Sequence, residues 1–233
     1  MSRFIEHLKD LILLPPLARR VRQANLTYLN RNKLHSLVAN LKGLDARKVE
    51  GDIYEFGIAL GGSSILMCHL MGPERRFHGY DLFGMIPPPS EKDGPDTHNR
   101  YEKIVKGESR GLNGDPYYGY ETDLYTKVVG NFAGMDLQVD GEHIALHQGL
   151  FEDTLRLESG AKIALAHVDC DWYDPVMFCL TSVAPHMTPG GRIIIDDYND
   201  YQGCKDASDA FLAGNDDFRM LSTQPHAILE RLR

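Results

Sequence analysis

The chain has no long hydrophobic run: nowhere in its 233 residues is there a stretch close to the ~18 consecutive apolar residues that a membrane-spanning helix needs. It also has no excess of basic residues, since 25 Lys and Arg stand against 33 Asp and Glu, and no basic stripe offsets the net charge of −8. Charged side chains break the first residues, which lack the apolar core of a signal peptide. We therefore expect a soluble cytoplasmic protein without a membrane or nucleic-acid partner.

Cysteine pairs are missing as well. None of the four cysteines has the paired spacing of a metal or redox motif; they are Cys68, Cys170, Cys179 and Cys204. We expect buried free thiols. Apolar residues make up 42% of the chain, which is enough for one sizeable core, and no linker or internal repeat is visible. We predict a single domain over residues 1–233.

The N-terminal segment, residues 1–45, has the apolar spacing of helices. A first helix fits residues 4–12 and is broken at Pro15–Pro16. A second helix fits Lys33–Leu41 and is stopped by Gly43. Because these helices precede the first strand, they are candidates for covering the sheet or for pairing with another subunit.

A strand, a glycine-rich turn and a helix then follow one another. The strand covers Ile53–Phe56, and the helix runs from about Ser63 to Met71. Glycines let a ligand approach the backbone, and a helix N-terminus presents free N–H groups. This unit therefore predicts a site for an anionic or zwitterionic cofactor.

The turn differs from a dinucleotide-binding turn. Its glycine spacing is not G-x-G-x-x-G, and the carboxylate of Glu55 would repel a pyrophosphate. That carboxylate suits the ammonium group of an amino-acid-like ligand, which favours S-adenosylmethionine over NAD. The residues predicted to contact this cofactor are Glu55, Gly57, Gly61 and Ser63.

An acidic residue, Asp81, ends the second predicted strand, Phe77–Asp81. A carboxylate at this position usually binds the two hydroxyls of a ribose. The alternative is a solvated aspartate in a loop. With the glycine turn in front of it, the ribose role is favoured.

The third predicted strand, residues 142–147, leads into a turn that we place beside the adenine of the cofactor. Gly149 to Glu152 would line it, and Phe151 would form its apolar wall. The alternative is a plain strand-to-helix turn in which Asp153 caps the helix.

Residues 84–131 have no sustained strand pattern and are rich in proline, glycine and charge. A segment of this length in a compact domain is often functional, so we predict a lid that closes over the acceptor substrate. Its tyrosines either line an acceptor pocket or pack the lid against the domain; they are Tyr117, Tyr118, Tyr120 and Tyr125.

The second half of the chain continues the strand and helix alternation. We predict a fourth strand, a helix capped by Asp174, a fifth strand, a further helix and a closing hairpin. Their ranges are 163–169, 174–183, 192–195, 205–212, and 220–222 with 227–229.

Carboxylates end both the fourth and the fifth predicted strands, at Asp169 and at Asp196–Asp197. The carboxyl ends of neighbouring parallel strands meet at one edge of a sheet, so we expect these side chains to converge. An all-carboxylate site selects a hard cation such as Mg²⁺. Two alternatives stay open: a metal-free site with one carboxylate as general base, or simple capping of the next segment. Asp171 and Asp174 are weaker ligand candidates.

A metal beside a methyl donor would fix an acceptor hydroxyl and lower its pKa. Asp169 is the best candidate for the catalytic base, because it lies between the cofactor edge and the metal and contacts both. His167 shares its face of the strand but lies deeper, and is more simply a strand residue.

Taken together, these motifs resemble those of the TylF-type macrocin O-methyltransferase family, metal-dependent sugar methyltransferases of natural-product biosynthesis. The matching stretches are Gly51–Gly57 with Gly61–Ser64, Gly79–Asp81, His167–Asp174, Pro189–Gly191, Ile194–Tyr198 and Gly203–Cys204.

The resemblance implies a class I (Rossmann-like) methyltransferase fold: α/β, with a mostly parallel seven-stranded sheet and a closing C-terminal hairpin. It implies S-adenosylmethionine as donor, and Mg²⁺ held by Asp169, Asp196 and Asp197. It also implies a deoxysugar hydroxyl of a glycosylated natural product as acceptor, and a homodimer or higher homo-oligomer built partly through the N-terminal helices. Thr27 and Tyr28 fall where such enzymes close a segment over the donor.

Two other functions remain as alternatives. One is a nicotinamide-dependent oxidoreductase on a similar sheet, which Glu55 and the missing dinucleotide spacing disfavour. The other is a methyltransferase-fold protein that binds the donor without catalysing a reaction.

Overall fold

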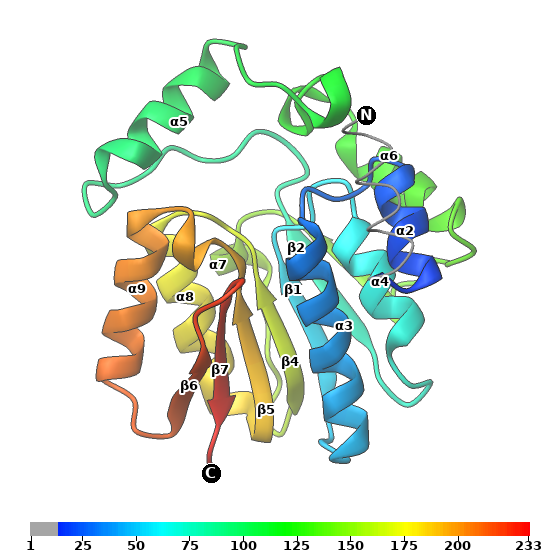
Figure 1. The fold of residues 1–233 in the computed structure, drawn as a ribbon, viewed down its shortest axis with the longest axis vertical. Coiled ribbons are helices and arrows are strands. Elements are labelled where there is room, and N and C mark those ends of the chain that lie inside the picture. Colours follow the sequence, from blue (N-terminus) through cyan, green and yellow to red (C-terminus); the bar gives the residue numbers. More distant parts are fainter. Residues whose placement is uncertain (1–13) are drawn as a thin grey trace.

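The structure, a computed structural model, describes residues 14–233; the first predicted helix, around residues 4–12, lies outside the described residues. Its centre is a seven-stranded sheet with the order β3-β2-β1-β4-β5-β7-β6 (Figure 1). Strands β1 to β5 are parallel, and β7 runs antiparallel to β5 and β6. The predicted sheet with its closing hairpin is confirmed. The strands are β1 (Asp52–Phe56), β2 (Phe77–Asp81), β3 (Ile144–Gln148), β4 (Ile163–Val168), β5 (Met187–Ile195), β6 (Phe218–Ser222) and β7 (Ala227–Arg231).

Helices cover both faces of this sheet (Figure 1). One face carries α2 (Pro16–Gln23), α3 (Arg31–Ala46), α4 (Gly62–Leu70) and α6 (Leu124–Ala133). The other carries α7 (Phe151–Thr154), α8 (Tyr173–Val183) and α9 (Gln202–Ala213), while α5 (Pro95–Val105) lies apart from both. Short 3₁₀ turns are η1 (Leu112–Gly114), η2 (Tyr118–Tyr120), η3 (Ala184–His186) and η4 (Asp196–Asn199). None of the helices within residues 14–233 is both long and apolar enough to cross a membrane.

The core lies in two layers, one on each side of the sheet. All six residues of β4 are buried, as expected for a central parallel strand covered on both faces. Successive side chains of a strand point to opposite faces, so Leu165 packs in the layer of α3 and α4 while Ala166 packs in the layer of α8 and α9. The four cysteines are buried and free, as predicted.

The helix α3 is longer than predicted, and the stop expected at Gly43 is wrong. It continues to Ala46 because Leu44 is buried in the core, and this packing outweighs the ~1 kcal/mol that a glycine costs inside a helix. Its N-terminus is fixed by Asn30, whose side-chain oxygen accepts hydrogen bonds from the N–H groups of Asn32 and Lys33. The position of Lys33 matters for the site.

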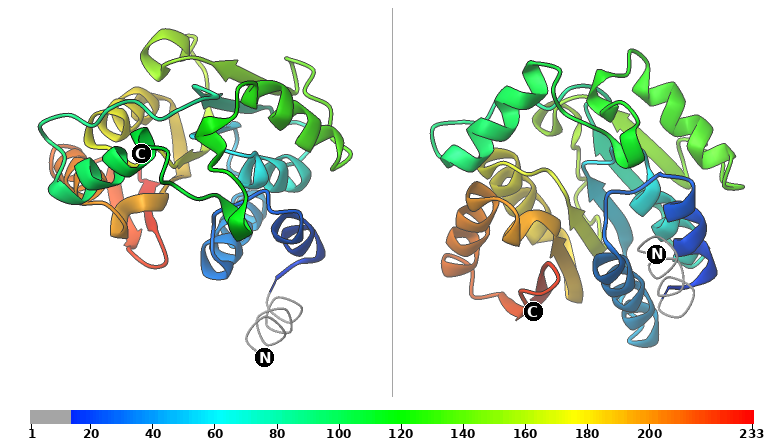
Figure 2. Two further views of the ribbon diagram at one scale, coloured as in Figure 1. Left: turned by 90° about the horizontal axis from the view of Figure 1, so that it is seen from above. Right: turned by 45° about the horizontal axis from the view of Figure 1, so that its top comes forward.

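Residues 84–123, called the lid below, pass over the edge of the sheet at which the parallel strands end (Figure 2). As predicted, they contain no strand. The remainder of the predicted lid, from Leu124 onward, belongs to α6, where Leu124 and Val128 are buried in the main core. The lid therefore ends before α6.

Candidate active site

A pocket opens between the lid and the ends of the parallel strands, with about 810 Å³ of space between atoms, part of it open to solvent. Strands β1 to β4 all contribute their C-terminal ends, which is where ligands bind in open α/β sheets. Six of the residues predicted from the sequence line it: Gly57, Asp81, Gly149, Phe151, Glu152 and Asp169.

The turn after β1 touches the end of β4. Gly57 has a φ of +90°, and a Cβ atom there would lie 1.8 Å from the carbonyl oxygen of Asp169. The N–H of Asp169 in turn donates to the carbonyl of Phe56, with an N to O distance of 2.8 Å. Only glycine fits this contact, which fixes the cofactor turn against the proposed base.

Asp81 shapes the same turn. One carboxylate oxygen accepts hydrogen bonds from the N–H groups of Ile58 and Ala59, at 2.7 and 3.1 Å, and the other accepts from Phe83 at 2.6 Å. Burial raises the pKa of Asp81, and the three N–H groups oppose that rise. Asp81 is buried at the pocket wall, so the alternative of a solvated loop aspartate is wrong.

Glu55 does not line the pocket. Its side chain is 0% exposed, accepts a hydrogen bond from the hydroxyl of Ser64, and lies 2.8 Å from Nδ1 of His167. The expected contact with the ammonium group of a ligand needs correction, because the carboxylate points into the layer beneath α4. The direct strand neighbour of Glu55 is His167, which makes the two an internal ion pair.

The other predicted cofactor residues also lie outside the wall. Gly61 is the N-cap residue of α4 and has a φ of +87°, and Ser63 is buried in the first turn of that helix. Thr27 crosses close to Gly62. Tyr28 is 43% exposed, and its ring lies 5.7 Å from that of Tyr118, which does line the pocket.

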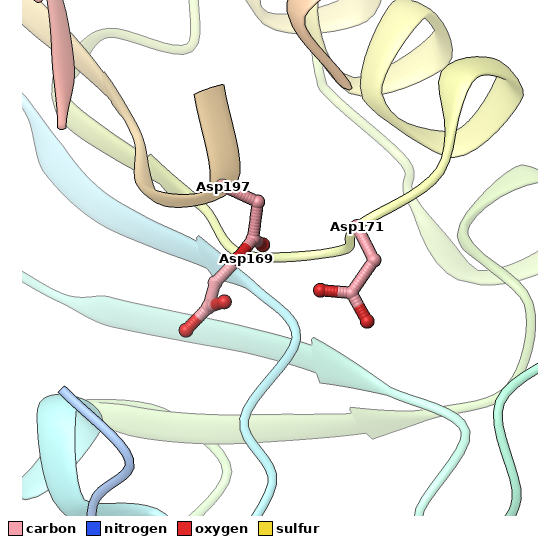
Figure 3. Close-up of side chains that lie close together, drawn as sticks. All are labelled: Asp169, Asp171 and Asp197. Carbon is pink, nitrogen blue, oxygen red and sulfur yellow. The ribbon is translucent and has the colours of Figure 1, made fainter. Parts of the chain in front are cut away.

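Three carboxylates lie close together at the strand ends, from Asp169, Asp171 and Asp197 (Figure 3), and the first two line the pocket. One oxygen from each lies within 4.8 Å of the others. Asp197 is buried, and its Oδ2 has no hydrogen-bond partner in the structure of residues 14–233. Burial raises the pKa of all three, and neighbouring carboxylates raise the pKa of Asp169 and Asp197 further. Such a cluster needs a proton or a cation.

Asp196 is not part of this cluster, although it was predicted to be. Its Oδ2 lies 2.8 Å from Nζ of Lys33, and its Oδ1 lies 3.3 Å from Nδ1 of His226. Burial would raise the pKa of Asp196, but His167, His226 and Lys33 hold it well below its usual range. Asp196 and Asp197 are adjacent in η4 and point in different directions.

The third member of the cluster, Asp171, comes from the loop between β4 and α8. Its backbone has a φ of +62°, a left-handed conformation that is uncommon for residues other than glycine. Strained backbone of this kind gathers at functional sites. The sequence signal was present in the acidic stretch, but loop position alone did not show which way the side chain points.

His167 joins two carboxylates below the pocket. It is 0% exposed, with Glu55 on Nδ1 at 2.8 Å and Oδ1 of Asp196 at 3.9 Å from Nε2. Burial alone would lower the pKa of His167, but the carboxylates of Asp196 and Glu55 raise it to about 10. The imidazole is therefore a buried positive charge at neutral pH.

The lid is tied to the helices that follow the acidic strand ends. Asp93 accepts a hydrogen bond from the N–H of Tyr173 at 2.9 Å, and Asp96 accepts from the N–H of Gln202 at 3.0 Å. The predicted capping of α8 by Asp174 is wrong: α8 begins at Tyr173, and Asp174 pairs with Lys92. The cap comes instead from the lid.

The lid also forms an apolar wall opposite the acidic cluster. Ile86, Pro87 and Pro88 line it, and the indole N–H of Trp172 donates to the carbonyl of Pro87 at 3.0 Å. Of the four tyrosines that the sequence placed in the lid, one of which (Tyr125) belongs to α6, only Tyr118 lines the pocket. The other three pack in the protein: Tyr117 is buried, Tyr120 donates to the carbonyl of Ile104, and Tyr125 packs on Phe83.

The sheet order, the glycine turn and the pocket at the strand ends define a class I, Rossmann-like methyltransferase fold, and solved structures share it. The O-methyltransferase NovP has a TM-score of 0.73 at 23% identity, covering 89% of this chain and 83% of its own. The O-methyltransferase TomG from Streptomyces achromogenes, solved with S-adenosylmethionine, has a TM-score of 0.57 at 12% identity, covering 98% and 96%.

The family model of the macrocin O-methyltransferases (TylF) matches residues 18–217, and the chain belongs to that family. A tetracenomycin-C rhamnosyl 4′-O-methyltransferase of Streptomyces olivaceus is 29% identical over 185 residues, which cover 78% of this chain and 65% of the relative. Demethyldecarbamoylnovobiocin O-methyltransferase of Streptomyces niveus is 27% identical over 197 residues, covering 80% and 68%. The chain thus spans about two thirds of the length of these relatives.

Proposed function

We propose that this protein transfers the methyl group of S-adenosylmethionine to a hydroxyl group of a glycosylated natural product, most simply a deoxysugar hydroxyl. One observation carries the proposal: a single pocket joins the glycine turn and Asp81 to the carboxylate of Asp169 and to an apolar wall. Membership of the macrocin O-methyltransferase family supports the reaction class. The two relatives described above are named for methylation of a rhamnosyl-tetracenomycin and of demethyldecarbamoylnovobiocin, which supports a natural-product acceptor.

The donor would lie along the β1 to β3 side of the pocket. Gly57 lines the space assigned to the methionine part, and Asp81 lies where the ribose is expected. Gly149 and Glu152 line the space assigned to the adenine, and the Phe151 ring is held by an edge-on contact with the core, 5.5 Å from the ring of Phe56. The acceptor would then lie between the carboxylates and the lid.

A divalent cation fits the carboxylate cluster. The donor set of Asp169, Asp171 and Asp197 is all oxygen, as Mg²⁺ prefers, and the unpartnered Oδ2 of Asp197 is a buried acceptor that a cation would satisfy. We propose that these three residues hold Mg²⁺, with Asp171 in place of the Asp196 expected from the sequence. When bound, the ion would supply charge that lowers the pKa of the acceptor hydroxyl.

The chain itself must position two substrates and accept a proton. In the transfer, the acceptor oxygen forms a bond to the methyl carbon while the carbon–sulfur bond breaks and leaves S-adenosylhomocysteine. The hydroxyl proton passes to the carboxylate of Asp169, which lines the pocket beside the proposed donor site. The lid would exclude water and hold the acceptor in line.

Methyl transfer is expected to stop when divalent metal is removed with EDTA and to return when Mg²⁺ is added. The test uses labelled S-adenosylmethionine with glycosylated aglycones, nucleotide sugars and phenols as acceptors. Full activity in EDTA would remove the metal from the proposal. Donor binding without transfer to any acceptor would favour the non-catalytic alternative.

The oligomeric state of the same sample, measured by light scattering, tests the expected homo-oligomer.

Asp81→Asn is expected to weaken binding of S-adenosylhomocysteine by about 10- to 100-fold. An amide is neutral and has one acceptor oxygen, so all three N–H groups in the turn lose a charged partner and at least one loses its acceptor, which is worth ~1.5–3 kcal/mol. Calorimetric titration measures the affinity, and Asp153→Asn, on an exposed side chain of α7, is the matched control. Unchanged affinity in Asp81→Asn would separate this residue from the donor site.

A further inference from the structure

We propose that the ammonium group of Lys33 takes the place of a second divalent cation, so that the acidic edge of the sheet holds one metal ion and not two. The proposal rests on the magnesium site of the proposed function and adds a role for a residue outside the strand motifs. Lys33 would act as a positioning residue that sets the number of ions at the site.

The geometry that points to this role is a pair of carboxylate groups that share Asp197. Asp169, Asp171 and Asp197 form the first group, and Asp197 forms a second with Asp196 and Asp200. In each group one oxygen per residue lies within 4.8 Å of the others. By spacing alone, the acidic edge could therefore hold two cations.

Lys33 already occupies the second group. Its Nζ lies 2.8 Å from Oδ2 of Asp196 and 2.7 Å from Oδ2 of Asp200. These are charge-assisted hydrogen-bond distances, so the ammonium already bonds one oxygen of each of these two carboxylates. The first group opens on the pocket, where Asp169 and Asp171 line the wall.

Both partners of the ion pair between Lys33 and Asp196 are buried. Lys33 is 8% exposed and Asp196 is 4% exposed, so each charge depends on the other. Burial would lower the pKa of Lys33, but Asp196 and its neighbours raise it above its usual value, so the group stays charged. Burial lowers the pKa of His226, the other partner of Asp196, so its imidazole does not supply a fixed positive charge.

The ammonium comes from the N-terminal part of the chain, which precedes the first strand. Lys33 lies in the first turn of α3, and the side chain of Asn30 fixes that turn by accepting its N–H bond at 3.1 Å. The helix packs against β5, which ends directly before Asp196. The packing of α3 against β5 therefore places the Lys33 ammonium beside Asp196 at the end of that strand. From the strand motifs alone, a metal ion would be expected at this position.

Removing this ammonium should create room for one extra metal ion. Lys33→Ala removes the ammonium that Asp196 and Asp200 share, and a hard cation is the natural replacement. With Mn²⁺ alone as the probe, counted by equilibrium dialysis, Lys33→Ala is expected to bind one more ion per chain than the wild type. Lys33→Ala combined with Asp200→Asn should return to the wild-type count. Lys92→Ala, which breaks an exposed ion pair with Asp174, should leave the count unchanged.

Thermal melting gives a second readout. Without metal, Lys33→Ala is expected to melt on the order of 10 °C below the wild type, because one partner of a buried ion pair is gone. Mn²⁺ should recover more of this loss in Lys33→Ala than it adds to the wild type. If the variant does not fold without metal, it is produced with Mn²⁺ present and counted after gel filtration.

A folded Lys33→Ala chain with the wild-type count would overturn the proposal, as would one that folds neither with nor without Mn²⁺. An extra ion that remains after Asp200→Asn is added would also overturn it, because that ion lies elsewhere. A wild type that binds no Mn²⁺ contradicts the proposed magnesium site instead. The difference between variant and wild type still decides the role of Lys33.

Discussion

Asp169→Asn is expected to lower kcat for methyl transfer by about 10³-fold, within the 10²- to 10⁴-fold range of a general base. The amide cannot accept the proton of the acceptor hydroxyl, and it removes one of the three carboxylates proposed to hold Mg²⁺. Single-turnover assays with saturating donor measure the effect. Asp174→Asn is the matched control, because this carboxylate follows closely in the chain but pairs with Lys92 near the surface. A loss of less than tenfold would exclude Asp169 as the base.

The same substitution should stabilise the metal-free protein. The pKa of Asp169 is raised in the folded state, so its contribution to stability is present at low pH and is lost as pH rises through the folded pKa. At pH 8 without metal, wild-type Asp169 is therefore unfavourable in the fold, and Asp169→Asn removes one charge from a repelling cluster. Melting in EDTA at pH 8 should show a higher temperature for the variant. An inactive variant that is less stable would indicate damage to the fold instead.

His167→Leu is expected to lower the free energy of unfolding by about 3–5 kcal/mol, the range for a buried ion pair that loses one partner. It would leave Glu55 as an uncompensated carboxylate that is 0% exposed. Urea denaturation at pH 7 measures the loss. His143→Leu, at an exposed position before β3, is the control. Adding Glu55→Gln to His167→Leu should restore part of the stability, because the buried charge is then gone.

The pH dependence gives the sign of this effect. The pKa of His167 is raised from 6.5 to about 10 in the folded state. Its stabilising contribution is therefore fully present below about pH 6.5 and is lost as pH rises through about 10. The difference between wild type and His167→Leu should shrink above pH 10. A difference that is constant from pH 6 to pH 11 would mean that packing, and not the charge on His167, accounts for the loss.

The sheet and the place of the site could be predicted from the sequence because both follow from local patterns. Buried apolar runs marked the strands, and parallel strands must end at one edge, which brought Asp169 and Asp197 together. The direction in which a side chain points from a turn could not be predicted in this way. Asp196 and Asp197 are neighbours in η4, and Asp196 is held away from the cluster by Lys33 and His226, both far away in the chain.

Long-range partners also explain the errors at Glu55 and at the start of α8. A carboxylate before a glycine turn suits the ammonium group of a ligand. In the fold, however, the carboxylate of Glu55 pairs with His167 in the neighbouring strand. An Asp–Pro pair is a typical helix start, yet the carboxylate that caps Tyr173 comes from Asp93 in the lid. Neither partner lies within the window of residues that a local pattern covers.

The attachment of the lid has a consequence for protein engineering. Asp93 and Asp96 join the lid to the first residues of α8 and α9, directly behind the loops that carry the acidic residues. A transplanted lid from a relative with another acceptor would therefore have to keep these two aspartates as its junction. The wall at residues 86–88 and the stretch between Asp96 and α6 are then the parts that can be exchanged. Such a design would change the residues that contact the acceptor and keep the hydrogen bonds of Asp93 and Asp96 to α8 and α9.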